Sequence, residues 1–244
     1  RAWPLQPVAA GRPGLLTGYH ETLLTGSRQR ESDTQVPLYA PPSRPPGGEP
    51  LPDRAAIDAG ALASTPVVAW ADDPVEAFFL HVQGSGRMQL RDGSILRIGF
   101  AGHNDRPYRS IGRELIERGE VDADTLDADV IKAWLRAHPD QADEVMRTNP
   151  RYVFFRVLEG VDPDQGPVGS LGVPLTAMRS IAVDPARVPP GALVYLDALP
   201  LAGEEDRYAW RRLAVAQDTG AAIRGAVRAD LFAGSDREAA SIAA

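Results

Sequence analysis

Three aspartates in the last third of the chain have sequence settings that suit acid–base chemistry. Asp184, Asp218 and Asp230 each adjoin a run of apolar residues. Burial among apolar side chains disfavours a charged carboxylate and raises its pKa. A carboxylic acid that stays protonated near neutral pH can donate a proton to a leaving group, which is what cleavage of a glycosidic bond requires.

Each of these aspartates also has a purely structural interpretation. Asp184 precedes a proline and is a good turn residue, and Asp218 precedes Thr219 and Gly220, a combination typical of turns and caps. Asp230 has the setting of a surface residue at the end of a strand. Spacing alone therefore leaves catalytic and structural roles open for all three.

Other chemistries have little support among the residue types present. The chain has no cysteine, which excludes disulfides, thiolate nucleophiles and cysteine-ligated zinc. Ser85 lies between two glycines but lacks the spacing of a hydrolase nucleophile elbow. The histidines lack paired metal-ligand spacing, so we expect them at helix ends or on strand surfaces: His20, His81, His103 and His138.

The bulk composition bounds the class of protein. With 244 residues, 43% of them hydrophobic, the chain can form one large or two modest domains with substantial cores. A net charge of −7 argues against non-specific binding to nucleic acid. No apolar run approaches the roughly 20 residues that span a bilayer. The sequence starts at Arg1, without a signal-peptide pattern and without an initiator methionine. We therefore expect any export signal or lipid anchor to lie outside this chain.

The elements that must position the aspartates are mostly strands. The 22 prolines and 23 glycines punctuate short apolar runs, a texture typical of mainly β proteins. The expected strands are Val67–Trp70, Ala77–Val82, Met88–Leu90, Ile95–Phe100, Tyr152–Arg156, Leu193–Leu196 and Arg212–Ala216. Asp92 and Gly93, between two of these runs, predict a tight hairpin.

Helices are expected only in the middle of the chain. Apolar residues recur at helical spacing over Ile111–Ile116 and again over Val130–Leu135. Asp127 or Asp129 can cap the second helix, and a third short helix is expected over Ala142–Arg147. The sequence thus predicts two β domains with a small helical insert.

Several motifs occur in a recognisable order along the chain. They are Gly18–Glu21, Val36–Tyr39, Phe78–Gly86, Gly102–Gly112, Trp134–Pro139, Asn149–Phe155 and Gln217–Gly225. Together they resemble the MltA family, the membrane-bound lytic murein transglycosylases A, and Gln217–Gly225 is similar to the core of that family's three-aspartate (3D) domain. The resemblance covers nearly the whole chain, although His20 stands where the family usually has tyrosine.

The resemblance implies a mainly β fold of two domains that flank a groove. A double-psi β-barrel-like catalytic domain would be assembled from residues 1–17 and 158–244. A second β domain, with the helical segment, would be inserted as residues 18–157. The glycan would lie in the groove between the two.

The resemblance also implies a reaction. Lytic transglycosylases cleave the β-1,4 bond between N-acetylmuramic acid and N-acetylglucosamine in peptidoglycan and leave 1,6-anhydromuramic acid ends. By position in the family motif, Asp230 would act first as acid and then as base, with Asp218 and Asp184 as supports. The implied substrate-binding residues are Tyr19, Gln83, Gly84, Ser85, Gly86, Asn104, Thr219 and Gly220. No metal or cofactor is implied.

The implied partners are peptidoglycan glycan strands. The implied location is the periplasm of a Gram-negative bacterium, with the protein held at the outer membrane by a lipid anchor outside the chain. We expect a monomer that does not bind nucleic acid. Two other classes stay open: a non-catalytic wall-binding protein of the expansin type, and a conventional two-carboxylate muramidase in which Glu21 assists Asp230.

Overall fold

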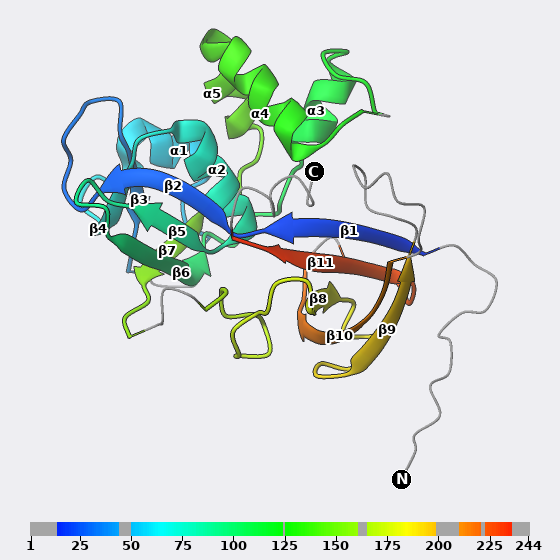
Figure 1. Ribbon diagram of the computed structural model, residues 1–244. Helices are drawn as coiled ribbons and strands as arrows, with labels where there is room; N and C mark the ends of the chain where they lie inside the picture. The colour runs from blue at the N-terminus through cyan, green and yellow to red at the C-terminus, as the bar shows by residue number, and fades with distance from the viewer. Residues whose placement is uncertain are drawn as a thin grey trace. The chain divides into compact units, whose positions relative to one another are not determined.

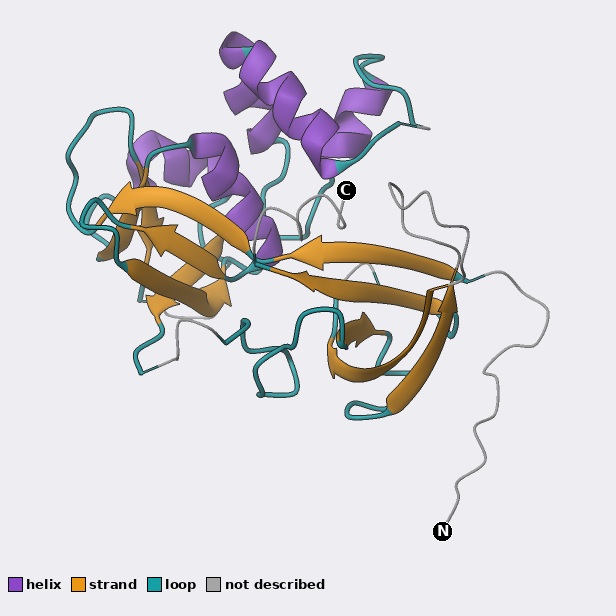
Figure 2. Ribbon diagram, viewed as in Figure 1, coloured by secondary structure: helices purple, strands orange, loops and turns teal. Residues whose placement is uncertain are grey.

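The computed structural model describes residues 14–43, 50–123, 125–160, 165–198, 210–220 and 223–235 (Figure 1). Strands dominate these residues and form two sheets, with short helices in the middle of the chain (Figure 2). The expected mainly β class is thereby confirmed. The chain divides into two compact units: unit 1 comprises Arg1–Glu21 and Asp164–Ala244, and unit 2 comprises Thr22–Pro163. Residues 1–13 and 236–244, which the resemblance assigns to the double-psi β-barrel-like domain, lie outside the described residues.

Unit 1 is built on a five-stranded sheet whose strands come from both ends of the chain. In spatial order they are β1 (Leu15–His20), β11 (Arg228–Gly234), β8 (Ser180–Val183), β10 (Trp210–Asp218) and β9 (Leu193–Ala198). β1 is parallel to β11 and β8 is parallel to β10, whereas β11 pairs with β8, and β10 with β9, in antiparallel fashion. Within the described residues β1 and β9 are the edges, so the sheet is not closed into a barrel there.

One face of this sheet carries the hydrophobic core of unit 1. The fully buried side chains that pack together there are Ile181, Val183, Ala214, Ala216 and Leu231. Successive side chains of a strand point to opposite faces of the sheet. Asp230 directly precedes Leu231 and therefore projects from the face opposite this core.

Unit 2 is built on a six-stranded sheet. In spatial order its strands are β3 (Val36–Tyr39), β4 (Val67–Ala71), β2 (Thr22–Ser27), β5 (Gly86–Gln89), β6 (Ile95–His103) and β7 (Val153–Val157). The hairpin expected at Asp92 and Gly93 joins β5 to β6 and is confirmed. Its turn is closed by a hydrogen bond from Leu90 N to Ser94 O (2.9 Å), and Gly93 has φ 82°, a conformation that glycine adopts without strain.

One expected strand is wrong. Ala77–Val82 belongs to a helix, α2 (Pro74–Gln83), which begins at the Asp73 cap, has proline at its first position and ends at Gly84 with φ 86°. α2 lies between two hydrophobic clusters, one on the sheet side and one on the helix side, so it is buried nearly all round. A continuous apolar run of this length does not by itself distinguish a buried helix from a buried strand.

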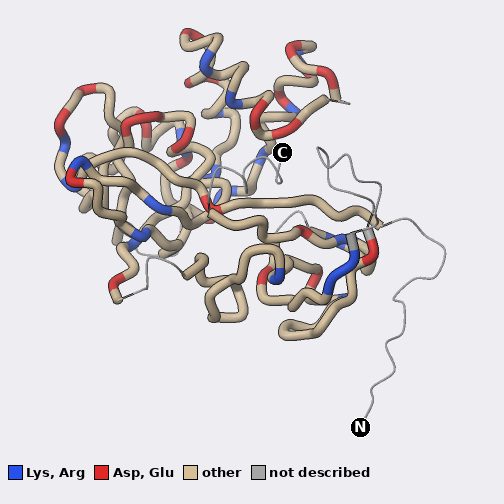
Figure 3. The backbone as a smooth tube through the Cα atoms, in the orientation of Figure 1, with Lys and Arg blue, Asp and Glu red and all other residues tan. Residues whose placement is uncertain are grey.

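The remaining helices are α1 (Arg54–Ala56), the π-helical turn η1 (Ile57–Ala61), α3 (Ile111–Glu117), α4 (Ala128–Ala137) and α5 (Pro139–Arg147). The three helices expected in the middle of the chain are confirmed, and the Asp127 side chain caps α4 by accepting a hydrogen bond from Val130 N (2.7 Å). Acidic and basic residues are interspersed along α3, α4 and α5 (Figure 3), and Arg118, at the end of α3, pairs with Glu114 of α3 and with Glu144 of α5. Within the described parts of the chain, no helix has the length and apolar character needed to cross a bilayer.

Candidate active site

Asp230 lies on β11, in the interior of the unit 1 sheet. It is in register with Thr17 on one neighbouring strand and with Ala182 on the other. The Thr17 hydroxyl donates a hydrogen bond of 2.6 Å to Asp230 Oδ1. β1 therefore fixes the position of this carboxyl group through the Thr17 hydroxyl, while β8 pairs with the backbone of β11 on its other side.

The surroundings of Asp230 favour its protonated form. Burial raises the pKa of the Asp230 carboxyl above its ordinary value, and the charge of Asp218 raises it further. The hydrogen bond from Thr17 and the nearby Arg228 act in the opposite direction, but they do not cancel the effect of burial. Asp230 is thus suited to hold a proton and to release it to a nearby oxygen atom.

Asp218 reaches the same face of the sheet through an irregularity in β10. Val215 and Ala216 pair regularly with β8, but the register then shifts by one residue, so that Asp218, and not Gln217, aligns with Ala182. Regular pairing would align Asp218 with the next residue of β8 and turn its side chain toward the core face. The shift therefore keeps the carboxylate on the polar face.

The two carboxyl groups lie at the same level of the sheet, on either side of β8. Both Asp230 and Asp218 align with Ala182, which is itself buried. Neighbouring strands are about 4.8 Å apart, which places the Cα atoms of the two aspartates roughly 10 Å apart. Two carboxyl groups on one polar face form the chemical centre of unit 1.

Tyr19 holds Asp218 in place. Its hydroxyl donates a hydrogen bond of 2.9 Å to Asp218 Oδ2, and the backbone N–H of Ser170 donates one of 3.0 Å to Asp218 Oδ1. The Tyr19 ring packs against Phe232 with 5.5 Å between ring centroids. Burial, followed by the charge of Asp218, raises the pKa of the Tyr19 phenol far above its ordinary value, so the hydroxyl remains a donor.

Asp184 has a different environment from the other two aspartates. Its carboxylate is 7% exposed and accepts hydrogen bonds from Gly225 N (2.8 Å) and Ala186 N (3.1 Å). These bonds, the one from Gly225 first, lower the pKa of Asp184 below its ordinary value. Asp184 therefore stays charged and ties the end of β8 to the segment that precedes β11.

Thr17 and Arg228 are functional candidates that the sequence did not reveal. Arg228 Nη1 donates to Thr17 Oγ1 (2.9 Å), which in turn donates to Asp230. Thr17 and Asp230 are separated by 213 residues, and no local pattern shows that their strands pair in parallel. Only the assembled sheet identifies Thr17 and Arg228 as neighbours of Asp230.

The segment Gln83–Gly86 joins α2 to β5 in unit 2. Gln83 is exposed, and its Oε1 accepts a hydrogen bond of 2.6 Å from the Thr22 hydroxyl. A side chain on Gly86 would place its Cβ 2.6 Å from Leu80 Cδ1 and 2.8 Å from Thr22 O, so only glycine fits there. Ser85 is half-buried between the two glycines. Packing thus explains the glycine at position 86, and the polar side chains of this segment are those of Gln83 and Ser85.

Thr219 and Gly220 follow Asp218 in a tight turn. Gly220 O accepts a hydrogen bond from Ile223 N (3.0 Å), and a Cβ at Gly220 would lie 2.8 Å from Ile223 Cγ1. Thr219 is exposed beside the carboxylate-bearing strand end. Thr219 therefore offers an exposed hydroxyl next to Asp218.

Asn104 needs a correction, because its side chain is not placed to contact a ligand. It is fully buried, and its Nδ2 donates to Pro52 O (2.9 Å) and Pro150 O (2.8 Å). Its Oδ1 accepts from Tyr152 N (2.9 Å). Asn104 joins three backbone segments of unit 2, which is a positioning role.

His81 was expected at a helix end or on a strand surface; it lies in the last turn of α2, as expected, but it is buried rather than exposed. It is 7% exposed, and its Nδ1 accepts a hydrogen bond from Val153 N (3.2 Å). Burial, with the nearby charge of Arg54, holds the pKa of His81 well below its ordinary value. The ring is therefore neutral, with its proton on Nε2.

The fold and the site define a class: mainly β proteins of two units, one of which presents an aspartate pair on the polar face of its sheet. Comparison with known families gives two matches, to the MltA-specific insert domain over residues 15–156 and to the 3D domain over residues 179–244. The chain belongs to the MltA family, which confirms the resemblance found in the sequence.

Relatives support this assignment in sequence and in structure. The membrane-bound lytic murein transglycosylase A of Escherichia coli (strain K12) is 35% identical over 244 residues, covering 98% of this chain. The chain spans 64% of the length of that relative. The lytic transglycosylase LtgG of Burkholderia pseudomallei is 48% identical with a TM-score of 0.71, covering 94% of this chain and 68% of that one. E. coli MltA with bound chitohexaose is 31% identical with a TM-score of 0.83, covering 94% of this chain and 68% of that one.

Proposed function

We propose that this chain is the catalytic part of a lytic transglycosylase that cleaves the β-1,4 bond between N-acetylmuramic acid and N-acetylglucosamine in peptidoglycan. The observation that carries the proposal is the Asp230 carboxyl, whose pKa is raised by burial on one face of a sheet and which is held in place by a hydrogen bond from Thr17. Relatives named as lytic murein transglycosylases, one of them solved with bound chitohexaose, support it.

In the first step Asp230 acts as the acid. Its proton passes to the oxygen that links the two sugars, the bond from that oxygen to C1 of N-acetylmuramic acid breaks, and an oxocarbenium-like sugar forms. The charged Asp218 lies on the same face and can stabilise this developing positive charge. Asp218 stays in place because Tyr19 and the Ser170 N–H bind its two oxygens.

In the second step Asp230, now a carboxylate, acts as the base. It takes the proton from the 6-hydroxyl of the same N-acetylmuramic acid, whose oxygen closes on C1 and gives a 1,6-anhydro ring. Because nucleophile and electrophile belong to one sugar, the effective molarity can reach about 10⁵ M. The proton from the 6-hydroxyl restores the acid form of Asp230, the first proton stays on the departing N-acetylglucosamine, and no water enters the products.

We further propose roles for the remaining candidates. Gln83 and Ser85 offer an amide and a hydroxyl for sugar recognition, and Thr219 offers a hydroxyl beside Asp218. Asp184 positions the segment before β11. The chain is proposed to act as a monomer on glycan strands in the envelope of a Gram-negative bacterium, since the curated relative is named membrane-bound.

Glu21 is a poor partner for Asp230 in a conventional hydrolase. Its backbone N–H bonds to Gly234 O, four residues further along β11, which is roughly 13 Å from Asp230. Its side chain is 4% exposed and accepts a hydrogen bond from the Ser235 hydroxyl. This placement favours Asp218 as the carboxylate that acts with Asp230.

Product analysis tests the proposal. Murein sacculi incubated with the chain are expected to release muropeptides that are lighter by one water than hydrolysed products, as mass spectrometry can resolve. Asp230→Asn should abolish release with the fold intact, whereas Asp197→Asn, on the exposed part of β9, should leave release unchanged. Products that carry the added water, or full release by Asp230→Asn, would contradict it, and binding without release would support a non-catalytic wall-binding protein.

A further inference from the structure

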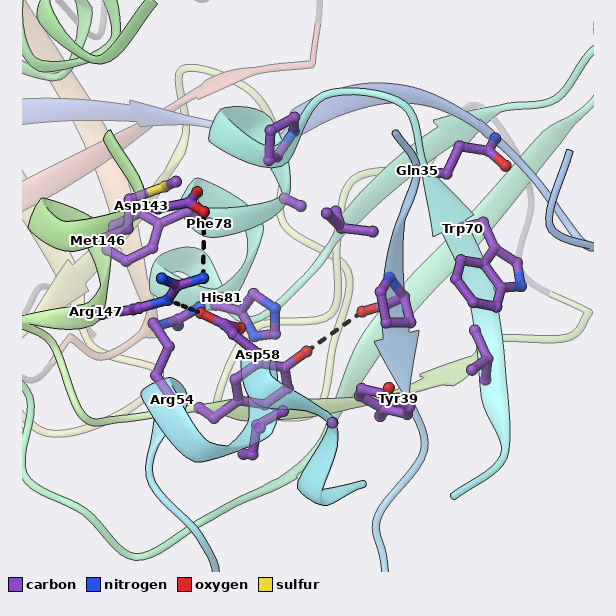
Figure 4. Close-up of a pocket in the computed structure, with 18 of the residues that line it drawn as sticks. Gln35, Tyr39, Arg54, Asp58, Trp70, Phe78, His81, Asp143, Met146 and Arg147 are labelled. Atoms are coloured by element: carbon purple, nitrogen blue, oxygen red, sulfur yellow. Dashed lines mark hydrogen bonds and ion pairs between the residues drawn. The ribbon is translucent and has the colours of Figure 1, made fainter. Parts of the chain in front are cut away.

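Unit 2 contains a cavity of about 520 Å³ that the proposed reaction does not use (Figure 4). Its walls come from β3 and the segment before it, β4, α1, η1, α2 as far as His81, α5 and Tyr152. None of the candidate substrate-binding residues lines it, since α2 contributes to it only as far as His81. Its volume lies within the range of about 300 to 1,000 Å³ that is usual for small-molecule sites.

Arg54 is a buried cation on the wall of this cavity. It is 4% exposed, and its guanidinium lies 4.7 Å from the Phe78 ring centroid and 5.1 Å from that of Tyr152. Nε and Nη2 donate to the backbone oxygens of Asn149 (3.3 Å) and Arg151 (2.9 Å), and among the described residues Arg54 forms no ion pair. Among the described residues no hydrogen bond engages its Nη1 group, and a guanidinium with free donors binds a carboxylate strongly.

Two further donors line the same cavity. The Tyr39 side chain lines the cavity, and its hydroxyl has no hydrogen-bond partner within the described parts of the chain. His81 accepts a backbone N–H at Nδ1, so its neutral ring carries a donor at Nε2. Unpaired donors around a buried cation are typical of an anion site.

The acidic residues of the cavity are already occupied. Arg147 binds Asp58 and Asp143, each at 3.2 Å (Figure 4). Asp58 also interacts with Arg54 through space, but its carboxylate is hydrogen-bonded to Arg147. Trp70 adds an apolar wall. The cavity therefore offers a positive end and an apolar surface to one ligand.

We propose that this cavity binds the carboxylate end of a short peptide, with Arg54 as the anion anchor, Tyr39 and His81 as further donors, and Trp70 in contact with the apolar part. The choice of a peptide rests on the proposed function, because peptidoglycan carries short peptides that end in a free carboxylate. The anion site itself rests on the geometry of unit 2.

Titration with N-acetyl-D-alanyl-D-alanine tests the assignment. Binding is measured by calorimetry and by tryptophan fluorescence, for which Trp70 is a reporter. The acid should bind, its C-terminal amide at least about tenfold more weakly, and inorganic phosphate more weakly than the acid. Equal affinity for acid and amide would overturn the proposal. So would no binding of the acid at about 10 mM, or tighter binding of phosphate.

Two variants locate the site. Tyr39→Phe removes one hydroxyl and no hydrogen bond within the described residues, so it should fold normally and weaken binding of the acid about tenfold. Arg54→Lys keeps the charge but loses the planar donor set, and should weaken binding at least as much. The control is Tyr195→Phe, on the exposed face of β9, which should bind like the unmodified chain. Unchanged binding in Tyr39→Phe and in a folded Arg54→Lys would refute the site.

Failure of this inference and failure of the proposed function give different results. Release of anhydro products without binding of the dipeptide would contradict the peptide site and support the proposed reaction. Binding of the dipeptide without any release from sacculi would do the reverse.

Discussion

Thr17 sets how readily Asp230 gives up its proton. Its hydrogen bond stabilises the charged carboxylate and so lowers the pKa of Asp230. Thr17→Val, which keeps the shape and removes the donor, should therefore raise that pKa. The first step needs protonated Asp230, so activity falls as pH rises through this pKa, and the alkaline limb of the pH–rate profile should move to higher pH. A limb that stays in place, or moves to lower pH, would remove Thr17 from the mechanism.

Asp230 should also make the fold less stable at neutral pH than at acid pH. Its pKa in the folded state is raised, so between the unfolded and folded pKa values the folded state binds more protons, and stability falls as pH rises through that window. Asp230→Asn removes this penalty. Its Tm should exceed that of the unmodified chain at pH 7, and the difference should vanish below the ordinary aspartate pKa of about 3.9. A lower Tm at pH 7 would mean that the charged carboxylate is stabilised by the fold.

At the residue scale the sequence was informative about Asp218 and Asp230 and silent about their partners. Apolar neighbours marked both aspartates as candidates for burial. Their hydrogen-bond donors, Tyr19 and Thr17, come from a strand at the other end of the chain. Asn104 also has a polar side chain at a motif position. Only the structure reveals that both the oxygen and the nitrogen of its amide are hydrogen-bonded to backbone groups.

At the element scale the packing of α2 against β2 and β5 depends on Gly86. A Cβ there would meet Leu80 and the backbone of Thr22 at less than 3 Å. Gly86→Ala should therefore destabilise the chain by about 2 kcal/mol, measured by urea unfolding. Ser85→Ala is the control, since it changes neither backbone nor packing and should stay within about 0.5 kcal/mol. Equal stability of the two variants would mean that the helix can shift without cost.

Elements with local signals were predictable, and those defined by distant partners were not. The β5–β6 hairpin follows from its Asp-Gly turn, and α4 from its spacing and its aspartate cap. β1, β8 and β11 were not predicted as strands, because β1 and β11 pair with strands far away in the sequence and β8 has only four residues. The run Ala77–Val82 was assigned to a strand although the Asp73–Pro74 start and Gly84 stop were present, since burial on all sides hides the helical period.

At the scale of the whole molecule, unit 1 depends on both ends of the chain. Removing residues 1–21 deletes β1 and makes β11 an edge strand, with Thr17 and Tyr19 lost from the site. We expect no release from sacculi and a lower unfolding temperature for unit 1, with the transition of unit 2 unchanged, since Thr22–Pro163 has its own sheet and clusters. Differential scanning calorimetry would separate the two transitions. A single transition at a lower temperature would show that the units unfold together.

The parallel pairing of β1 with β11 also has a consequence for the order of folding. The middle of the chain can form its contacts early, because they close shorter loops, whereas the pair Thr17–Asp230 closes a loop of 213 residues. Asp230 follows the inserted unit along the chain and therefore emerges after it during synthesis. A ribosome-bound nascent chain should therefore already contain the folded inserted unit before Asp230 is buried in its sheet and its pKa is raised.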